Sequence, residues 1–248
     1  MREEDRKRAV VTGAASGIGK AVALRLVEEG CAVLAVDLDG ARLAALAAEG
    51  CDTRVVDVAD QDQREALAAS VEGFDYLVNS AGIIRIMPIF ELTVEDWRQV
   101  QTVNAESIFF LCQKIGPRLR PGGAIVNLSS SSAKLATSTD VAAYAASKTT
   151  ILSITRSFSY ALADRPVRVN AICPGIVETE MQEKFLAEVA GHRNTTAADF
   201  DALRKKGVPL QRGASAEECA GAIWFLLSDE AAYMTGQAIN FTGGLVNW

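Results

Sequence analysis

Tyr144 and Lys148 lie four residues apart in the chain. If the segment is helical, this spacing places both side chains on one helix face, about 6 Å apart along the axis. A free phenol titrates at about pH 10, roughly three units too high for a base at neutral pH, and a neighbouring ammonium favours the phenolate. The pair therefore predicts a tyrosine that exchanges protons with a substrate.

An isolated pair of this kind is a weak signal, because most such tyrosines belong to a core and most such lysines are solvated. Two further features support the chemical interpretation. A run of hydroxyl side chains, Ser129 to Ser132, precedes the pair, and a glycine-rich turn occupies residues 12–19. A proton-exchanging tyrosine combined with a nucleotide-binding turn predicts an oxidoreductase.

The glycine-rich turn contains Gly13, Gly17 and Gly19, and it lies between an apolar strand pattern and a helical pattern. Glycines let the backbone approach a ligand closely, and the first N–H groups of the helix can face a pyrophosphate. Asp37 ends the next predicted strand, where an acidic residue can bind the adenosine ribose. A glycine triplet alone is unspecific, but this strand-turn-helix unit followed by Asp37 predicts a dinucleotide site.

Asp37 also indicates which dinucleotide is bound. Its carboxylate can accept hydrogen bonds from both ribose hydroxyls, whereas the 2′-phosphate of NADP would meet like charge. Ser16 and Leu38, where a basic residue could contact that phosphate, are uncharged, and Arg42 is interpreted as a solvated helix residue. We therefore predict NAD.

Seven short runs rich in β-branched residues predict strands, with helical patterns between them. The predicted strands are 9–12, 32–36, 53–58, 74–78, 124–128, 167–172 and 237–241. Asp57 and Val58 end the third strand, and the segment 79–82 follows the fourth beside the switch point. The pattern predicts an α/β fold: a Rossmann-like doubly wound parallel sheet of seven strands with helices on both faces.

We expect one domain over residues 1–248, because no linker, low-complexity tract or repeat divides the chain. The helical pattern between 178 and 207 is interrupted at 191–196, and such an insertion after a strand is a candidate substrate lid.

The composition excludes several classes of function. The net charge of −6 argues against nucleic-acid binding, and the segment 2–8 mixes both charge signs, as a solvated tail does. The five widely spaced cysteines are expected to be reduced and packed in the interior. The single histidine, His192, leaves little basis for a Ser-His-Asp hydrolase or a multi-histidine metal site, and we expect no metal. Without an apolar run long enough for a bilayer, we expect a cytoplasmic protein with no membrane partner.

Taken in order, the motifs resemble the short-chain dehydrogenase/reductase family from end to end. They are the form Thr-Gly-x-x-x-Gly-Ile-Gly of the turn, the segment 79–82, Asn104, the Ser/Tyr/Lys set, Pro174-Gly175 and Thr235-Gly236. The chain departs from the family pattern at Ser80, where asparagine is common, and at Thr242, where aspartate is common. Neither departure falls on a residue that the acid/base chemistry uses.

The resemblance implies a catalytic tetrad. Tyr144 is the general acid/base, Lys148 lowers its pKa and binds the nicotinamide ribose, a serine holds the substrate oxygen, and Asn104 anchors a water. The implied cofactor-binding residues are Gly13, Ser16, Gly17, Ile18, Gly19, Asp37, Leu38, Asp57, Val58, Asn79, Ala81, Gly82, Tyr144, Lys148, Pro174, Gly175, Val177 and Thr179. The family also implies a homotetramer.

The identity of the catalytic serine stays open between two positions. The commoner family spacing, thirteen residues before Tyr144, selects Ser131, whereas counting from the end of the preceding predicted strand selects Ser130. We favour Ser130, because a strand fixes its own end while an extra residue is easily absorbed in the following loop.

These features predict hydride transfer between NAD and a small secondary alcohol or its ketone, such as a polyol, a sugar or a short hydroxy acid. The residues expected to face that substrate are Arg85, Ile86, Lys134, Val141, Ile176, Met181 and the region around His192. Two alternatives are an NAD-dependent epimerase or dehydratase and a non-catalytic NAD-binding protein. The direction of the reaction stays open.

Overall fold

The computed structural model describes residues 6–135, 138–192 and 195–248. In these residues seven parallel strands form one sheet in the order β3-β2-β1-β4-β5-β6-β7. The strands are β1 (Arg8–Thr12), β2 (Ala32–Asp37), β3 (Asp52–Val55), β4 (Tyr76–Asn79), β5 (Ala124–Leu128), β6 (Arg168–Pro174) and β7 (Ala238–Phe241). This confirms the predicted doubly wound sheet.

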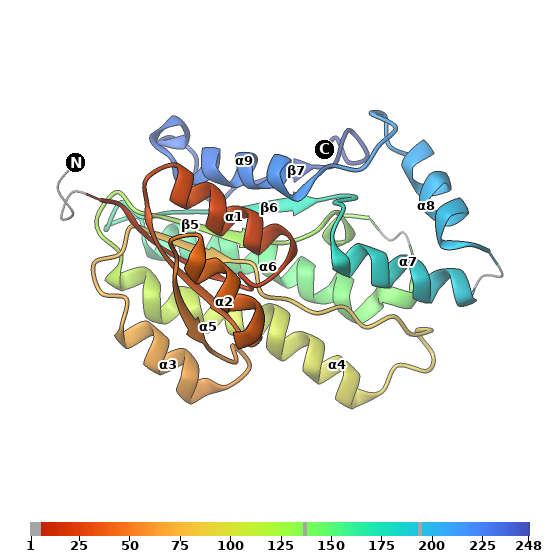
Figure 1. Ribbon diagram of the computed structural model, residues 1–248, viewed down its shortest axis with the longest axis horizontal. Helices are drawn as coiled ribbons and strands as arrows, with labels where there is room; N and C mark the ends of the chain where they lie inside the picture. Colours follow the sequence, from red (N-terminus) through yellow and green to blue (C-terminus); the bar gives the residue numbers. More distant parts are fainter. Residues whose placement is uncertain (1–5, 136–137, 193–194) are drawn as a thin grey trace.

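Helices cover both faces of the sheet (Figure 1). The α-helices are α1 (Gly17–Glu28), α2 (Gly40–Ala48), α3 (Gln61–Ala69), α4 (Val94–Gln101), α5 (Ser107–Ile115), α6 (Ala142–Ala161), α7 (Glu180–His192), α8 (Ala197–Lys206) and α9 (Ala216–Leu227). Shorter helical turns are η2 (Thr102–Glu106), η3 (Gly116–Arg118), η4 (Ser131–Ala133), η5 (Thr139–Val141) and η6 (Asp229–Ala231). Helices α1, α2 and α9 share one buried apolar cluster, and α3, α5 and α6 share the other.

The strand residues explain these two layers. Val10 contributes to one apolar cluster while its neighbours Ala9 and Val11 contribute to the other, because successive side chains of a strand point to opposite faces. A strand buried on both faces is therefore apolar throughout, which is the pattern that the sequence shows for β1.

The switch point of the sheet lies between β1 and β4, where Thr12 pairs with Asn79. The turn after β1 packs directly against the segment after β4. A Cβ added to Gly13 would lie 2.6 Å from the Cα of Ala81, and Gly13 also has a φ of +67°. Both facts require glycine here, because a side chain would clash and would strain the backbone.

Most strand ends differ from the prediction by one to three residues, and two differences bear on the site. Strand β3 ends at Val55, so Asp57 and Val58 lie in the turn beyond it rather than in the strand. The ladder stops there because β2 ends at Asp37, whose carbonyl accepts the last bond from the N–H of Val56 at 2.9 Å. The backbone expected to be loop at 191–192 continues helix α7, and residues 193–194 fall outside the described residues.

Candidate active site

A cavity of about 990 Å³ opens at the carboxyl ends of the strands, where ligands bind in doubly wound sheets. Its walls come from the turn after β1, from the ends of β2, β4, β5 and β6, and from α7 and α8. The predicted site residues on its wall are Gly13, Ser16, Gly17, Ile18, Gly19, Asp37, Leu38, Asp57, Val58, Ala81, Gly82, Ser130, Tyr144, Lys148, Pro174, Gly175, Val177 and Thr179. Asn79 and Asn104 do not line it.

The turn after β1 has the properties that a pyrophosphate requires. A Cβ added to Gly19 would lie 2.0 Å from the carbonyl oxygen of Gly13, so the turn can close only with glycine. Ser16 precedes α1 without a side-chain capping bond, and the first turn of α1 contains no acidic residue. The first N–H groups of the helix are thus left for an anion at the cavity wall.

Asp37 is held in a fixed position at the end of β2. Its Oδ2 accepts a hydrogen bond from the N–H of Ala15 at 2.9 Å, and its Oδ1 accepts one from the N–H of Asp39 at 3.1 Å. Arg42, the nearest cation along the chain, instead pairs with Glu180 of α7 at 2.7 Å and with Asp39 at 3.3 Å. Among the described residues no ion pair joins Arg42 to Asp37 at the crevice.

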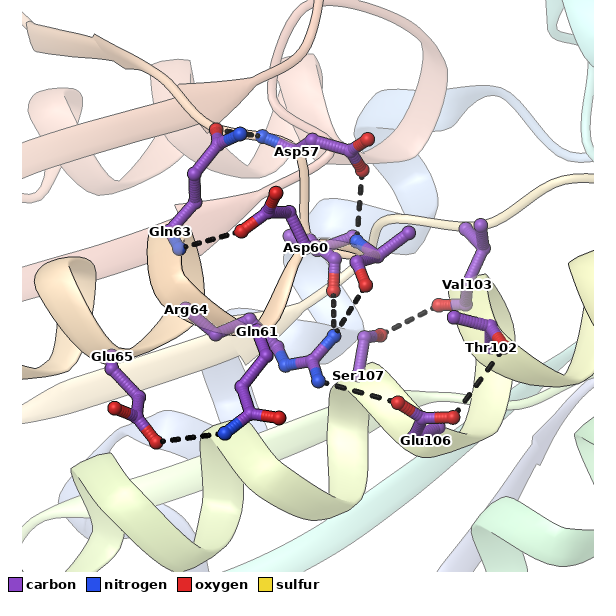
Figure 2. Close-up of polar contacts among 12 residues, drawn as sticks. Asp57, Asp60, Gln61, Gln63, Arg64, Glu65, Thr102, Val103, Glu106 and Ser107 are labelled. Carbon is purple, nitrogen blue, oxygen red and sulfur yellow. Dashed lines mark hydrogen bonds and ion pairs between the residues drawn. The ribbon is translucent and has the colours of Figure 1, made fainter.

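A buried arginine supports the turn that contains Asp57 (Figure 2). Arg64 of α3 is 4% exposed and donates to the carbonyls of Val58 at 2.7 Å and Ala59 at 2.9 Å. Its other terminal nitrogen pairs with Glu106 at 3.2 Å. Glu106 ends the π-helical turn η2, so Arg64 connects the cavity wall to that turn. Sequence reasoning missed Arg64, because a single arginine in an amphipathic helix usually indicates a solvated residue.

Tyr144 lies in the first turn of α6, where its phenol and the Ser130 side chain line the same cavity and Ser130 lies close enough to lower the pKa of the phenol. Ser130 precedes η4, and its Oγ accepts a hydrogen bond from the N–H of Ser132 at 3.1 Å. This bond uses an acceptor site and leaves the hydroxyl hydrogen of Ser130 free to donate. Ser131 also lines the cavity, but in the described part of the chain no hydrogen bond joins it to Tyr144.

Lys148 lies one turn further along α6 and is buried. Its Nζ donates a hydrogen bond to the carbonyl of Leu128 at 2.8 Å and lies 5.5 Å from the centroid of the Tyr144 ring. A Cβ added to Gly82 would lie 3.4 Å from this Nζ and 3.3 Å from the Oδ1 of Asn104. The ammonium and the amide thus flank Gly82.

The titration of this pair differs from the expectation. Burial raises the pKa of Tyr144, and the nearby Ser130 side chain opposes that rise. Burial lowers the pKa of Lys148 from its ordinary value of 10.5 to about 8. The expectation that Lys148 brings the Tyr144 pKa down is not met by the protein alone: the group that lowers this pKa is Ser130, and desolvation of the phenol is the larger effect.

The two predicted asparagines are fully buried. Asn104, in η2, accepts from the N–H of Ile83 at 2.8 Å and donates to the Ile83 carbonyl at 2.9 Å and to Ser147 at 3.0 Å. Both amide hydrogens are therefore used, and Oδ1 keeps one lone pair for a water. The Asn79 amide donates to Asn127 of β5 at 2.8 Å and to the thiol of Cys112 of α5 at 3.5 Å, and the side chain does not line the cavity.

The predicted substrate residues divide into two groups. Val141, Ile176 and Met181 line the cavity, whereas Arg85, Ile86 and Lys134 do not. Lys134 donates to the Ala238 carbonyl at 3.1 Å and to Asn240 at 2.6 Å, and Arg85 donates to Gln99 at 2.7 Å. These contacts correct the expectation for the two cations, and the side chain of His192 falls outside what the structure describes.

Sequence reasoning missed several residues on the substrate side of the cavity. These are Arg98, Gln182, Phe185, Phe200, Leu203 and Arg204. They come from α4, α7 and α8, whose placement over the cavity depends on tertiary packing and left no local signal in the sequence.

The cysteine prediction is confirmed, because all five thiols are free and buried. Burial raises the pKa of Cys112 to about 12, so this thiol is inert as a nucleophile at neutral pH. Of the helices described, none is both long and apolar enough to cross a membrane.

Comparison with known proteins adds an independent finding. The sequence model of a family described as enoyl-(acyl carrier protein) reductase matches residues 13–246. The chain is 39% identical over 252 residues to the D-threitol dehydrogenase of Mycolicibacterium smegmatis, covering 97% of this chain and 93% of that protein. It is 40% identical over 252 residues to the 3-oxoacyl-acyl-carrier-protein reductase of Thermotoga maritima, covering 97% and 98%.

A solved structure shares the whole fold. A variant of the actinorhodin polyketide ketoreductase, crystallised with NADPH, superposes with a TM-score of 0.91 at 31% identity, covering 100% of both chains. Fold, motif order and relatives agree. The chain belongs to the short-chain dehydrogenase/reductase family.

Proposed function

We propose that this oxidoreductase transfers a hydride reversibly between NAD and a small secondary alcohol or its ketone. The observation that carries the proposal is that Ser130, Tyr144 and Lys148 line the same cavity as the glycine turn and Asp37. Relatives include proteins named for the oxidation of an alcohol and for the reduction of a ketone, and both directions use the same chemistry.

In the oxidation direction, the Ser130 hydroxyl would hold the substrate oxygen and Tyr144, as its phenolate, would accept the substrate proton; Ser130 favours this phenolate and burial disfavours it. A bound NAD supplies nicotinamide C4 as the hydride acceptor. The glycine turn and Asp37 hold its pyrophosphate and adenosine ribose, while Pro174, Gly175, Val177 and Thr179 line the nicotinamide side. Lys148 binds the nicotinamide ribose, and Asn104 anchors a water through its remaining Oδ1 lone pair.

The preference for NAD rests on charge at the adenosine end. Asp37 presents a carboxylate there, and the nearest cation, Arg42, is held by Glu180 and Asp39. A 2′-phosphate at that place would meet like charge. One structural relative was crystallised with NADPH, so we do not expect the NAD preference to extend to every relative.

The experiment that tests the function is a scan of alcohols with both cofactors. The purified protein is mixed with NAD or NADP and with polyols, sugars or short hydroxy acids, and absorbance of the reduced nicotinamide is followed. We expect turnover with at least one class, and a kcat/KM for NAD about tenfold or more above that for NADP. No absorbance change with any alcohol would overturn the proposal.

Three further features complete the proposal. Helices α7 and α8 form a lid over the substrate half of the cavity. Exposed aromatic residues on α4, α5 and α6, namely Trp97, Phe109 and Tyr160, fit the subunit contacts of a homotetramer, which sedimentation would test. The reduced cysteines fit a cytoplasmic protein.

A further inference from the structure

The substrate half of the cavity is lined by apolar side chains and arginines. The apolar residues come from α7, α8 and the C-terminal segment: Met181, Phe185, Phe200, Leu203 and Leu245. Two cations, Arg98 of α4 and Arg204 of α8, lie on the same walls. The acidic residues on the cavity wall are Asp37 and Asp57 at the cofactor half, and Glu180, which pairs with Arg42 at 2.7 Å.

Arg204 is held by aromatic packing rather than by an acid. Its guanidinium carbon lies 4.8 Å from the ring centroid of Phe185 and 5.9 Å from that of Phe200. Its Nη1 is buried without a hydrogen-bond partner. Stacking fixes the plane of a guanidinium and leaves the N–H groups at its edge for a planar anion.

The acidic neighbour of Arg204 is engaged by another cation. Asp201, one turn earlier on α8, pairs through Oδ2 with Lys205 at 2.7 Å, and Lys205 also pairs with Glu178 at 3.1 Å. The Oδ1 of Asp201 has no partner either, yet no ion pair joins it to Arg204 among the described residues. Among the described residues no ion pair is formed by Arg204, although the Asp201 charge still acts on its guanidinium from one turn away.

A second donor lies on the facing helix. The Nε2 of Gln182, on α7, is buried without a hydrogen-bond partner, and Gln182 lines the same cavity. Arg98 is exposed at the rim, and its side chain forms no hydrogen bond or ion pair with the described residues. Buried donors without acceptors cost free energy, and a bound carboxylate would satisfy them through charge-assisted, bidentate bonds.

We propose that the substrate is a hydroxy acid whose carboxylate binds to Arg204, with an apolar chain between the carboxylate and the reacting carbon. This inference rests on the proposed function and names its substrate class. A polyol would place hydroxyls against the apolar walls and would leave the guanidinium with only neutral partners. An anionic, partly apolar molecule matches both features of the cavity.

The test compares matched substrates in the whole protein with NAD. One series is straight-chain hydroxy acids with the hydroxyl at successive carbons, and the other replaces each carboxylate by a CH2OH group. For the best acid we expect kcat/KM to exceed that of its diol by about 10- to 100-fold, the range of a charge-assisted hydrogen bond. In Arg204→Gln this ratio should fall toward unity through a higher KM for the acid.

Three controls separate the explanations. Lys206→Gln removes a charge from the same helix outside the cavity and should leave the ratio unchanged. Arg204→Lys should retain part of the acid-to-diol ratio that Arg204→Gln loses. Asp201→Asn should also leave the acid-to-diol ratio of kcat/KM unchanged. A fall in this ratio equal to that in Arg204→Gln would show that Arg204 acts as the ionic partner of Asp201, and it would overturn the proposal.

The outcomes also distinguish this inference from the proposed function. If no alcohol is oxidised at all, the function itself fails. If diols and acids are oxidised equally and Arg204→Gln changes neither, the function stands and the carboxylate site is overturned. If phosphorylated polyols are preferred and that preference is lost in Arg204→Gln, an anion site stands but its assignment to a carboxylate is overturned.

Discussion

The chemistry of the site depends on two hydroxyl groups that lie close together. Ser130 can donate toward Tyr144, because its own acceptor site is used by the N–H of Ser132. This contact favours the phenolate while burial disfavours it. Ser131, its neighbour on the cavity wall, has no such contact with Tyr144 in the described residues.

We therefore expect the two serines to respond differently to mutation. Ser130→Ala should lower kcat about 10²- to 10³-fold, the usual cost of one donor to a developing charge. Ser131→Ala, the matched control, should change kcat by less than about tenfold. Steady-state kinetics on the same alcohol measures both kcat values. Equal losses in the two variants would contradict the assignment of Ser130 as the catalytic serine.

Asp37 is expected to set the cofactor preference. Asp37→Ser removes the carboxylate and should raise kcat/KM for NADP relative to NAD by about tenfold or more, because one like charge near a phosphate costs at least about 1.4 kcal/mol. Asp52→Ser, a change at an exposed residue of β3 away from the cavity wall, serves as the control. An unchanged cofactor ratio in Asp37→Ser would show that the preference arises elsewhere.

Motif residues such as Gly13, Asp37 and Tyr144 were predictable because their spacing follows from backbone geometry. The glycines occur where a Cβ would clash, and the tyrosine and lysine share a helix face. Arg64 and Arg204 were not predictable, because burial of a single arginine depends on elements that are distant in sequence. The raised pKa of Tyr144 was missed for the same reason: desolvation is a property of the packed protein.

Among the elements, α3 has a role that its sequence does not reveal. Through Arg64 it holds the turn after β3, which lines the cavity, and the π-helical turn η2, which carries Asn104 (Figure 2). The Nε of Arg64 is buried without a hydrogen-bond partner, so the guanidinium is kept inside by its three other contacts. A stacked ring, Phe110 of α5, lies 5.5 Å away.

Replacing Arg64 should remove its contacts with the turn after β3 and with η2. Arg64→Met is expected to lower the free energy of unfolding by about 2 kcal/mol, because two carbonyls lose a charged donor. It should also raise KM for NAD more than it lowers kcat, since the turn at Asp57 lies at the cofactor half of the cavity. Urea denaturation and steady-state kinetics measure these effects.

Glu106→Gln is the matched control for Arg64. The Glu106 side chain is 44% exposed, so its ion pair with Arg64 is worth about 1 kcal/mol or less. The Gln variant keeps an acceptor and should retain nearly normal stability and KM. A larger effect of Glu106→Gln than of Arg64→Met would contradict the assignment of Arg64 as the central residue.

The seven strands were predicted closely, because a buried parallel strand is a run of β-branched residues whose length shows in the sequence. The third was predicted too long at 53–58, since its apolar residues continue past Val55 into the cavity wall. Helices α7 and α8 were predicted only as an irregular zone. Their apolar residues face a cavity rather than a core, so the helical periodicity is weak there.

For the molecule as a whole, the buried Lys148 opposes folding at neutral pH. Its pKa is about 8 in the folded protein, against an ordinary value of 10.5. Between these values the unfolded chain binds more protons than the folded one, so this residue makes stability rise with pH across that window. Below about pH 8 the ammonium is present in both states, and its burial penalty is present in full.

Lys148→Met should therefore be at least as stable as the wild type at about pH 7, although inactive. Its advantage should shrink between about pH 8 and about pH 10. Urea denaturation at the two ends of this pH range measures the difference in unfolding free energy between the variant and the wild type. The titration of the cysteines and tyrosines contributes equally to both proteins and cancels in that difference. Lys20→Met, at an exposed position of α1, is the control, and a difference independent of pH would contradict the low pKa of Lys148.

The central claim is that Tyr144 exchanges the substrate proton, and one measurement tests it most directly. The kcat of Tyr144→Phe is compared with that of the wild type on the best alcohol at saturating NAD, after fluorescence has shown equal NAD affinity. We predict a loss of about 10²- to 10⁴-fold, the contribution of general acid–base catalysis. Turnover within about tenfold of the wild type, with NAD bound normally, would contradict the claim.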